Sequence, residues 1–360
     1  MKIKLFLCGG ETPVSENPLG LGYLKSNCTD ADIEIVDERK DLTDCDMIGL
    51  SSTAGGLKEA VEILAEANGI PVIIGGQGTM WDGLNDYPFK HIVHGEGETA
   101  LQGIINGKAE GTKHIRCSNI PDLDELCFPD RGRLYCSEVP ILTSRGCPWN
   151  CYFCSSQNYW GKTRWHSAEY VMSEVKHIDR MYPKAEVLYI MDDLFIVNLK
   201  RFNEIYEQWM KDGFNKRFEL KGFVRSKSMT LEIAKQMKEM GFLSVRFGAE
   251  SGSNRLLKYI NKKETVEDHQ RCIDICQQAG LNVCASLIQY LPSETVDDRK
   301  LTGEFRKKNE RILCISGNYK FQPFPGTHFY DGSSPLEGDW RTRGGDFNKK
   351  PALIEEGVTK

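Results

Sequence analysis

The sequence predicts an α/β protein in which a Rossmann-like parallel sheet is followed by a partial (β/α)6 barrel of the TIM type. Two observations lead to this fold class. Short apolar runs alternate with helical patterns along most of the 360 residues, and strands that alternate with helices build parallel sheets. The alternation is interrupted once, over residues 107–138, which predicts two domains joined by a linker.

The first domain is predicted over residues 1–106. Strands are expected at 3–7, 33–36, 47–51, 72–74 and 91–93, and apolar residues at helical spacing predict a helix between the third and fourth of them. Glycines cluster after three of these strands, at 55–56, 75–78 and 95–97. Glycine at a strand end lets the backbone approach a ligand closely, and ordinary tight turns are the alternative explanation.

The second domain is predicted over residues 139–330. Six strands, at 141–144, 187–191, 219–224, 243–247, 283–289 and 312–321, are each expected to be followed by a helix or a turn. Ser167, Thr230 and Thr265 stand where helix N-caps are expected. The active site of such a barrel lies at the carboxyl ends of the strands. Residues 331–360 have little periodicity, so we expect a loosely ordered tail.

Three cysteines follow the first strand of the second domain. Cys147, Cys151 and Cys154 lie within eight residues, on a stretch that Gly146 and Pro148 keep irregular. Iron–sulfur clusters are normally held by four cysteine thiolates, so three would leave one iron open to bind a second molecule. A zinc site and three unrelated thiols are the alternatives. Zinc sites usually add a second cysteine pair or histidines, and none follows at suitable spacing.

The segment Cys-x-x-x-Cys-x-Phe-Cys resembles the signature of radical S-adenosylmethionine (SAM) enzymes. The resemblance implies that Cys147, Cys151 and Cys154 hold a [4Fe–4S] cluster whose open iron chelates SAM, and that Phe153 packs near the adenine. In that family one electron from the cluster cleaves SAM. The product is a 5′-deoxyadenosyl radical, which abstracts hydrogen from an unactivated carbon.

Later strand ends also resemble this family. Asp192 and Asp193 follow the second strand, Arg225 the third, and Glu250 and Ser251 the fourth. The resemblance implies that these residues contact the cationic groups, the carboxylate and the ribose of SAM, respectively. A solvated turn, a surface arginine and a glycine-rich turn without a ligand are the alternatives.

Ser286 and Tyr290 stand where the family usually has glycines, and a Pro-x-Pro-Gly-Thr-like segment at 323–327 is expected to border the substrate cavity.

The first domain resembles the cobalamin (B12)-binding-type domain of one branch of the family. Residues 17–24 match its opening segment, and its strand ends are matched by Ser51, Ser52, Thr53, Gly75, Gly76 and Thr79. The resemblance implies that these strand ends line the nucleotide tail of cobalamin. The Asp-x-His-x-x-Gly segment that supplies a cobalt ligand in many B12 proteins is absent. Cobalamin bound without that histidine, and a domain that keeps the fold without the cofactor, are both left open.

Net charge and composition limit the classes of binding partner that the sequence predicts. A net charge of −5 gives no general basic field for nucleic acid. No run of 18 apolar residues predicts a membrane span. Thirteen cysteines, mostly within apolar segments, indicate free thiols in a reducing cytoplasm. The expected partners are a small-molecule substrate and an electron donor such as flavodoxin or ferredoxin.

The sequence therefore predicts a cytoplasmic enzyme that cleaves SAM reductively, with cobalamin-dependent methyl transfer to a small organic substrate as its expected reaction. No catalytic side chain beyond the cofactor contacts is predicted. The alternatives are a radical SAM oxidoreductase or rearrangement enzyme without cobalamin, a catalytically idle corrinoid-binding protein, and a zinc-stabilised structural protein.

Overall fold

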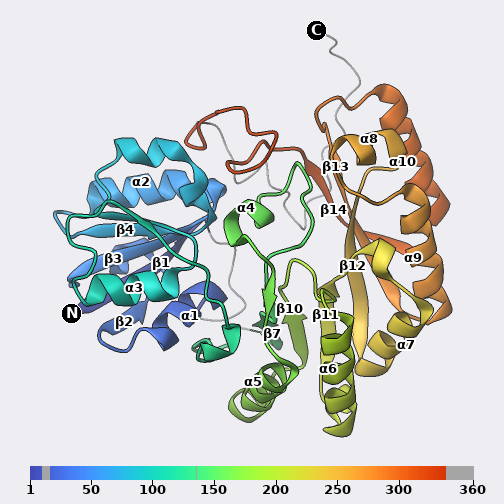
Figure 1. Cartoon of the computed structure of the whole chain (residues 1–360), viewed down its shortest axis with the longest axis horizontal. Helices are drawn as coiled ribbons and strands as arrows, with labels where there is room; N and C mark the ends of the chain where they lie inside the picture. Colours follow the sequence, from blue (N-terminus) through green and yellow to red (C-terminus); the bar gives the residue numbers. More distant parts are fainter. Residues whose placement is uncertain (10–16, 135, 338–360) are drawn as a thin grey trace.

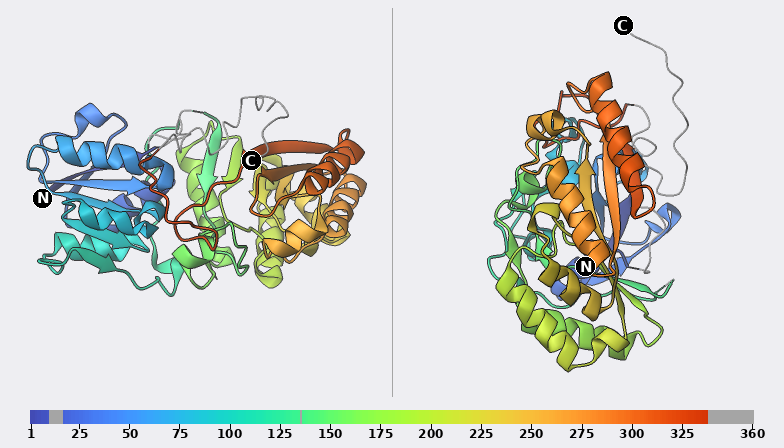
Figure 2. Two further views of the ribbon diagram at one scale, coloured as in Figure 1. Left: turned by 90° about the horizontal axis from the view of Figure 1, so that it is seen from above. Right: turned by 90° about the vertical axis from the view of Figure 1, so that its right-hand side faces the viewer.

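Two six-stranded parallel sheets organise the protein, whose structure is a computed structural model. It describes residues 1–9, 17–134 and 136–337. The sheets belong to two domains that lie side by side, as Figures 1 and 2 both show. None of the described helices is long and apolar enough to cross a membrane.

The first sheet has the strand order β2-β1-β3-β4-β5-β6. Its central strands are continuous apolar runs because helices cover both faces. Helices α1 and α3 pack on one face with Leu21 and Leu101, and α2 packs on the other with Leu57 and Ile63. The elements are β1 (Lys2–Cys8), α1 (Leu19–Asn27), β2 (Asp32–Ile35), β3 (Met47–Ser52), α2 (Leu57–Glu66), β4 (Val72–Gly75), β5 (His91–His94), α3 (Gly97–Ile105) and β6 (His114–Arg116).

The second sheet has the order β7-β10-β11-β12-β13-β14, with its first and last strands at opposite edges. It is therefore the predicted partial barrel, open between β7 and β14, with helices on its outer face (Figure 1). Its strands are β7 (Glu138–Ile141), β10 (Val187–Ile190), β11 (Glu219–Phe223), β12 (Phe242–Glu250), β13 (Asn282–Gln289) and β14 (Leu313–Lys320). Its helices are α4 (Ser156–Trp160), α5 (Ala168–Met181), α6 (Leu199–Lys211), α7 (Leu231–Met240), α8 (Asn254–Tyr259), α9 (Val266–Gln278) and α10 (Val296–Asn309).

Short 3₁₀ helices occupy several connections. They are η1 (Arg39–Asp41), η2 (Ala54–Gly56), η3 (Gln77–Met80), η4 (Asp82–Asp86), η5 (Leu123–Glu125), η6 (Phe214–Lys216) and η7 (Ser226–Ser228).

The structure differs from the sequence-based expectation in three places. The first barrel strand is β7, at Glu138–Ile141, instead of 141–144. Ser144–Arg145 forms a separate strand, β8, which pairs antiparallel with β9 (Arg164–Trp165). Strand β6 lies within the predicted linker and extends the first sheet. Most of the predicted tail, residues 338–360, lies outside the described residues.

Residues 321–337, which we call the closing segment, follow β14 and run back toward the first domain (Figures 1 and 2). Asn158 of α4 donates a hydrogen bond to the carbonyl oxygen of Gly326 at 2.7 Å. His328 stacks on Tyr152 of the cysteine-bearing loop, with ring centroids 4.2 Å apart. Leu336 packs against the core of the first domain. The closing segment therefore contacts both domains.

Candidate active site

The three predicted cluster cysteines lie on the loop between β8 and α4. Cys151 is buried, Cys147 is half-buried and Cys154 is exposed. Burial by the surrounding protein is the main cause that raises the pKa of Cys154 to about 12, and the charges of Asp193, Cys151 and Cys147 raise it further. Cys154 is accessible to solvent and is also surrounded by protein atoms, so it lies in a concave part of the surface. The structure thus brings the three thiols together, and metal binding would supply the energy to deprotonate them.

In the described ranges, no group of three His, Cys, Asp or Glu side chains is arranged to hold a metal ion. Metal analysis of the purified protein therefore has to distinguish an iron–sulfur cluster from zinc at the cysteine loop.

Asp192 and Asp193, predicted as a pair, face different surroundings. Asp192 is buried and accepts hydrogen bonds from the Thr143 amide and hydroxyl, both at 2.6 Å, and from the Ser144 hydroxyl at 2.7 Å. It therefore anchors the chain that leads into the cysteine loop. Asp193 is exposed, and it accepts a hydrogen bond from Ser156 at 2.5 Å. Its influence on the Cys154 pKa places it beside the thiols, so a contact with SAM stays a prediction for Asp193.

Two buried cationic side chains, Arg225 and Lys262, lie close to Cys151. The Arg225 guanidinium stacks on the Trp149 ring at 3.9 Å and donates a hydrogen bond to the backbone oxygen of Lys262. Burial raises the pKa of Cys151, whereas the charges of Lys262 and Arg225 lower it. The cations therefore favour a thiolate at this cysteine.

Lys262 is a site residue that the sequence did not reveal. It follows α8 and belongs to no motif, yet its ammonium lies 2.8 Å from Glu250 and 3.7 Å from Glu264. Burial lowers the pKa of Lys262, but the two carboxylates outweigh burial and the pKa is raised. Lys262 thus connects the predicted SAM-binding strand end to the cysteine loop.

Phe153 belongs to a small apolar cluster beside the same lysine. It packs against Leu256, Leu257, Ile260 and Leu291. The Lys262 ammonium lies 5.9 Å from its ring centre. The ring is half-buried, so its predicted packing against adenine stays a prediction.

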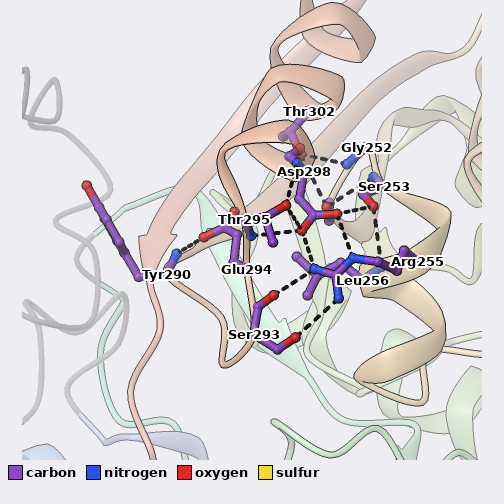
Figure 3. A network of polar contacts seen from close by, with 11 residues as sticks. Gly252, Ser253, Arg255, Leu256, Tyr290, Ser293, Glu294, Thr295, Asp298 and Thr302 are labelled. Carbon is purple, nitrogen blue, oxygen red and sulfur yellow. Dashed lines mark hydrogen bonds and ion pairs between the residues drawn. The ribbon is translucent and has the colours of Figure 1, made fainter. Parts of the chain in front are cut away.

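The loop that carries Glu250 and Ser251 is held by a polar network around Asp298 (Figure 3). The Ser253 hydroxyl donates to Asp298 at 2.5 Å, and Arg255 also hydrogen-bonds to that carboxylate. Thr302 accepts a hydrogen bond from the Gly252 amide at 2.9 Å. Glu250 itself has a φ of +60°, a conformation that costs about 1 kcal/mol or more and persists only where the surroundings enforce it. The network supplies that enforcement.

A cavity of about 320 Å³ lies at the carboxyl edge of the first sheet, where it meets the barrel. Of the predicted cobalamin contacts, Ser51, Gly75 and Gly76 line it. A side chain at Gly76, whose φ is +87°, would place its Cβ 2.6 Å from the Ser52 oxygen, so only glycine fits. The other lining residues used below are Tyr23, Glu96, Glu98, Arg145, Trp160 and Met191.

The structure does not bring Ser52, Thr53 or Thr79 to this cavity. The Ser52 hydroxyl donates to the Thr53 oxygen, and the Thr79 hydroxyl donates to the Gly76 oxygen, both at 2.8 Å. Both hydroxyl groups thus stabilise the turns that shape the lining. Contacts of these three residues with a ligand stay predictions.

Arg145, two residues before Cys147, closes the cavity from the barrel side. Its guanidinium pairs with Glu98 at 2.6 Å and with Glu96 at 2.9 Å. It also lies over the rings of Tyr23 and Trp160, at 5.2 and 5.5 Å. The cavity and the cysteine loop are therefore joined through one side chain, which the sequence motifs did not single out.

Comparisons with known proteins agree with this arrangement. Residues 141–305 match the Radical SAM superfamily. An uncharacterised methyltransferase of Pyrococcus horikoshii is 28% identical, with 92% of this chain and 83% of that protein covered. The bacteriochlorophyllide d C-12(1)-methyltransferase of Chlorobaculum tepidum is 24% identical, over 83% of this chain and 70% of that protein.

Two solved structures share the fold of both domains. The radical SAM methyltransferase TsrM of Kitasatospora setae superposes with a TM-score of 0.75 at 15% identity, over 91% of this chain and 75% of that one. The cobalamin-dependent SAM radical enzyme OxsB gives a TM-score of 0.72 at 20% identity, over 93% of this chain and 55% of that one. The region that matches the Radical SAM superfamily, residues 141–305, contains the three clustered cysteines and the strand ends around them.

Proposed function

We propose that this chain is a radical SAM methyltransferase that uses cobalamin and acts on a small organic substrate. When bound, a [4Fe–4S] cluster would supply the electron that cleaves SAM, and cobalamin would carry a methyl group. The observation that supports this best is the cavity between the two domains. It joins the glycine-rich strand ends of the first domain to Arg145, Trp160 and Met191 on the barrel side.

The residues around Cys151 fit an anionic cluster and the carboxylate of SAM. Arg225 and Lys262 supply two positive charges beside the thiol. The buried Nε of Arg225 makes no hydrogen bond within the described residues and lies 3.6 Å from the Glu264 carboxylate, so it keeps a free hydrogen-bond donor. In this proposal Arg225 binds the SAM carboxylate, Glu250 and Ser251 the ribose, and Asp193 the ammonium group.

In this proposal the interdomain cavity holds the nucleotide tail of a cobalamin. Its volume of about 320 Å³ is at the lower end of the range for ligand sites. None of its lining residues is a histidine. The two histidines of β5 make other contacts, His91 with the Thr112 oxygen at 2.6 Å and His94 with His114 at 3.0 Å. In this proposal the lining therefore provides no imidazole to cobalt.

Radical SAM enzymes need a reductant, and we include a flavodoxin- or ferredoxin-type donor and a cytoplasmic location in the proposal. No disulfide joins the cysteines of the described ranges. Free thiols persist in reducing compartments, where the cluster would also be protected.

Anaerobic purification followed by iron, sulfide and zinc analysis tests the proposal. The reconstituted protein should contain iron and sulfide and should release 5′-deoxyadenosine or S-adenosylhomocysteine from SAM under reduction. Cys147→Ala should lose the cluster and SAM turnover. Cys127→Ala, which removes an exposed thiol from the connecting segment, should keep both. SAM turnover that survives in Cys147→Ala, or zinc in place of iron, would refute the proposal.

Adding cobalamin to the purified protein tests the proposal that the enzyme uses this cofactor. The optical spectrum of the purified complex should show a bound corrinoid. A corrinoid that binds while SAM is never consumed would instead identify an idle corrinoid-binding protein. SAM cleavage without any corrinoid binding would identify the cobalamin-independent alternative.

A further inference from the structure

Residues 260–264, between α8 and α9, are docked on the cysteine loop. The Tyr152 amide donates a hydrogen bond to the Ile260 oxygen at 3.0 Å. The Asn261 side chain donates another to the Asn150 oxygen at 2.5 Å. This segment therefore keeps a fixed position relative to the loop that carries the three cysteines.

The backbone of the segment is strained on both sides of Lys262. Asn261 and Lys263 have φ values of +56° and +60°. Asparagine tolerates this left-handed conformation, whereas lysine rarely adopts it. Strain of this kind persists only where the surroundings enforce it, and it is concentrated at functional sites. The strained turn places the Lys262 ammonium 2.8 Å from the Glu250 carboxylate and offers the Lys262 backbone oxygen to the Arg225 guanidinium.

Glu264, at the end of the segment, is buried, and its two carboxylate oxygens have different surroundings. Oε1 accepts hydrogen bonds from the Ser226 hydroxyl at 2.7 Å and from the Lys227 amide at 2.8 Å. Oε2 lies 3.6 Å from the Arg225 guanidinium and 3.7 Å from the Lys262 ammonium. These two distances are longer than a hydrogen bond. Glu264 therefore attracts both cations without occupying their N–H groups.

The arrangement of the charges gives Glu264 a role that Glu250 cannot fill. The charges of Lys262 and Arg225 lower the pKa of Cys151, so both cations act on the cysteine loop. Glu250, at the end of β12, attracts only Lys262 at salt-bridge distance. Without Glu264, the Lys262 ammonium would pair with Glu250 alone. A cation of the site and a predicted ribose contact would then occupy each other.

We propose that Glu264 is a positioning residue of the cofactor site, which keeps Lys262 from pairing wholly with Glu250 and directs Lys262 and Arg225 toward the cysteine loop. The inference rests on the proposed function, in which these cations face the cluster and the carboxylate of SAM. The Glu264 charge is fixed in place by Ser226 and Lys227. It also opposes the addition of an electron to a cluster on that loop, because nearby charge sets the reduction potential.

The test compares Glu264→Gln with the wild type after cluster reconstitution. Glutamine can keep both hydrogen bonds of Oε1, so the substitution removes mainly the charge. SAM binding, followed by the change that SAM causes in the electron paramagnetic resonance (EPR) spectrum of the reduced cluster, should weaken about tenfold. The cluster potential, measured by EPR-monitored redox titration without SAM, should become more positive. A merely structural role would lower the cluster content and would not move the potential in this direction.

Two further variants complete the test. Glu264→Asp keeps the charge but withdraws it by one methylene, so the potential should stay near that of the wild type while SAM binding weakens about threefold. This variant decides the question even where Glu264→Gln does not fold. Glu267→Gln makes the same change of charge at an exposed position in the first turn of α9, and it should change neither quantity. Wild-type SAM affinity in both Glu264 variants, or an equal shift of the potential in Glu267→Gln, would overturn the role of Glu264.

The outcome is separable from that of the proposed function. SAM cleavage by the wild-type protein tests the radical chemistry and involves no Glu264 variant. Cleavage by the wild type, with unchanged SAM affinity in both Glu264 variants, would leave the proposed function intact and remove the role of Glu264. A wild-type cluster that never binds SAM would refute the proposed function. A more positive potential in Glu264→Gln would still show that Glu264 acts on the cluster.

Discussion

Arg145 and Glu98 form a buried ion pair of 2.6 Å that connects the approach to the cysteine loop with the first turn of α3. Burial lowers the pKa of Arg145, but Glu98 and Glu96 outweigh burial and raise it, so the guanidinium stays charged. The same arginine lines the interdomain cavity. A ligand in that cavity would therefore touch the side chain of Arg145, which lies two residues before Cys147.

Removing the Glu98 charge should destabilise the protein strongly. In Glu98→Gln, one carboxylate, Glu96, is left for two arginines, Arg145 and Arg164. Breaking a buried ion pair costs about 3 kcal/mol, measured as the free energy of unfolding in urea. Glu34→Gln is the control, because that carboxylate is about half exposed and lies 3.6 and 3.8 Å from its lysines. Its loss should cost less than about 1 kcal/mol. Equal effects of the two variants would contradict the role given to Glu98.

Asp298 should make stability depend on acid pH. Hydrogen bonds from Arg255, and then from Ser253 and Thr295, hold the pKa of this carboxyl well below its usual range. Its stabilisation is present above the unfolded pKa of about 3.9 and is lost as the pH falls below that value. Asp298→Asn should cost about 2 kcal/mol at neutral pH and should flatten the acid limb of the stability curve. Asp297→Asn, at an exposed neighbouring position, should leave that limb unchanged.

Two buried histidines should give a second pH dependence. Burial is the main cause that lowers the pKa of both His166 and His269 to about 4. The unfolded chain takes up protons near pH 6.5, so stability is full above that pH and falls as the pH drops toward 4. Each histidine contributes about 3 kcal/mol over this range.

Urea unfolding at a series of pH values measures this effect. His166→Gln should reduce the slope of unfolding free energy against pH between 6.5 and 4 by about one proton. The slope of His166→Gln is compared with that of the wild-type protein under the same conditions. A wild-type slope of zero in this range would contradict the burial of neutral histidines.

Tyr290 directly follows β13 and has a backbone φ of +60°. A substitution that relieves this backbone strain should raise the stability of the protein. Tyr290→Gly should stabilise the protein by about 1 kcal/mol, because glycine adopts positive φ without a steric penalty. Tyr290→Ala removes the same ring but keeps a Cβ, so it should give no such gain. The melting temperatures of the two variants measure the difference. A lower melting temperature for Tyr290→Gly would show that the ring contributes more by packing than the strain costs.

Local chemistry made most of the fold predictable. The side chains of Ser167, Thr230 and Thr265 cap α5, α7 and α9 as expected, and Thr265 forms a capping box with Asp268. These contacts join residues three apart, so the sequence alone contains them. The alternation of strands and helices likewise predicted both parallel sheets.

The residues of the candidate site could be predicted only where they belong to a sequence motif. The cysteines and Glu250 are recognisable from their spacing, whereas Lys262 reaches Glu250 only through the path of α8 and its turn. Arg145 and Glu98 are 47 residues apart in sequence. Such pairs depend on how two domains dock, which no local pattern records. For the same reason Asp192, predicted as a ligand contact, could not be recognised as an anchor for Thr143 and Ser144.

The closing segment has a consequence for how the two domains are coupled. Its Gly326 oxygen and His328 ring contact α4 and the cysteine loop, and its Leu336 packs against the core of the first domain. The cysteine loop is therefore connected to the first domain by a second path that does not pass through residues 107–138. A shift of one domain relative to the other would reach the cysteine loop along this path.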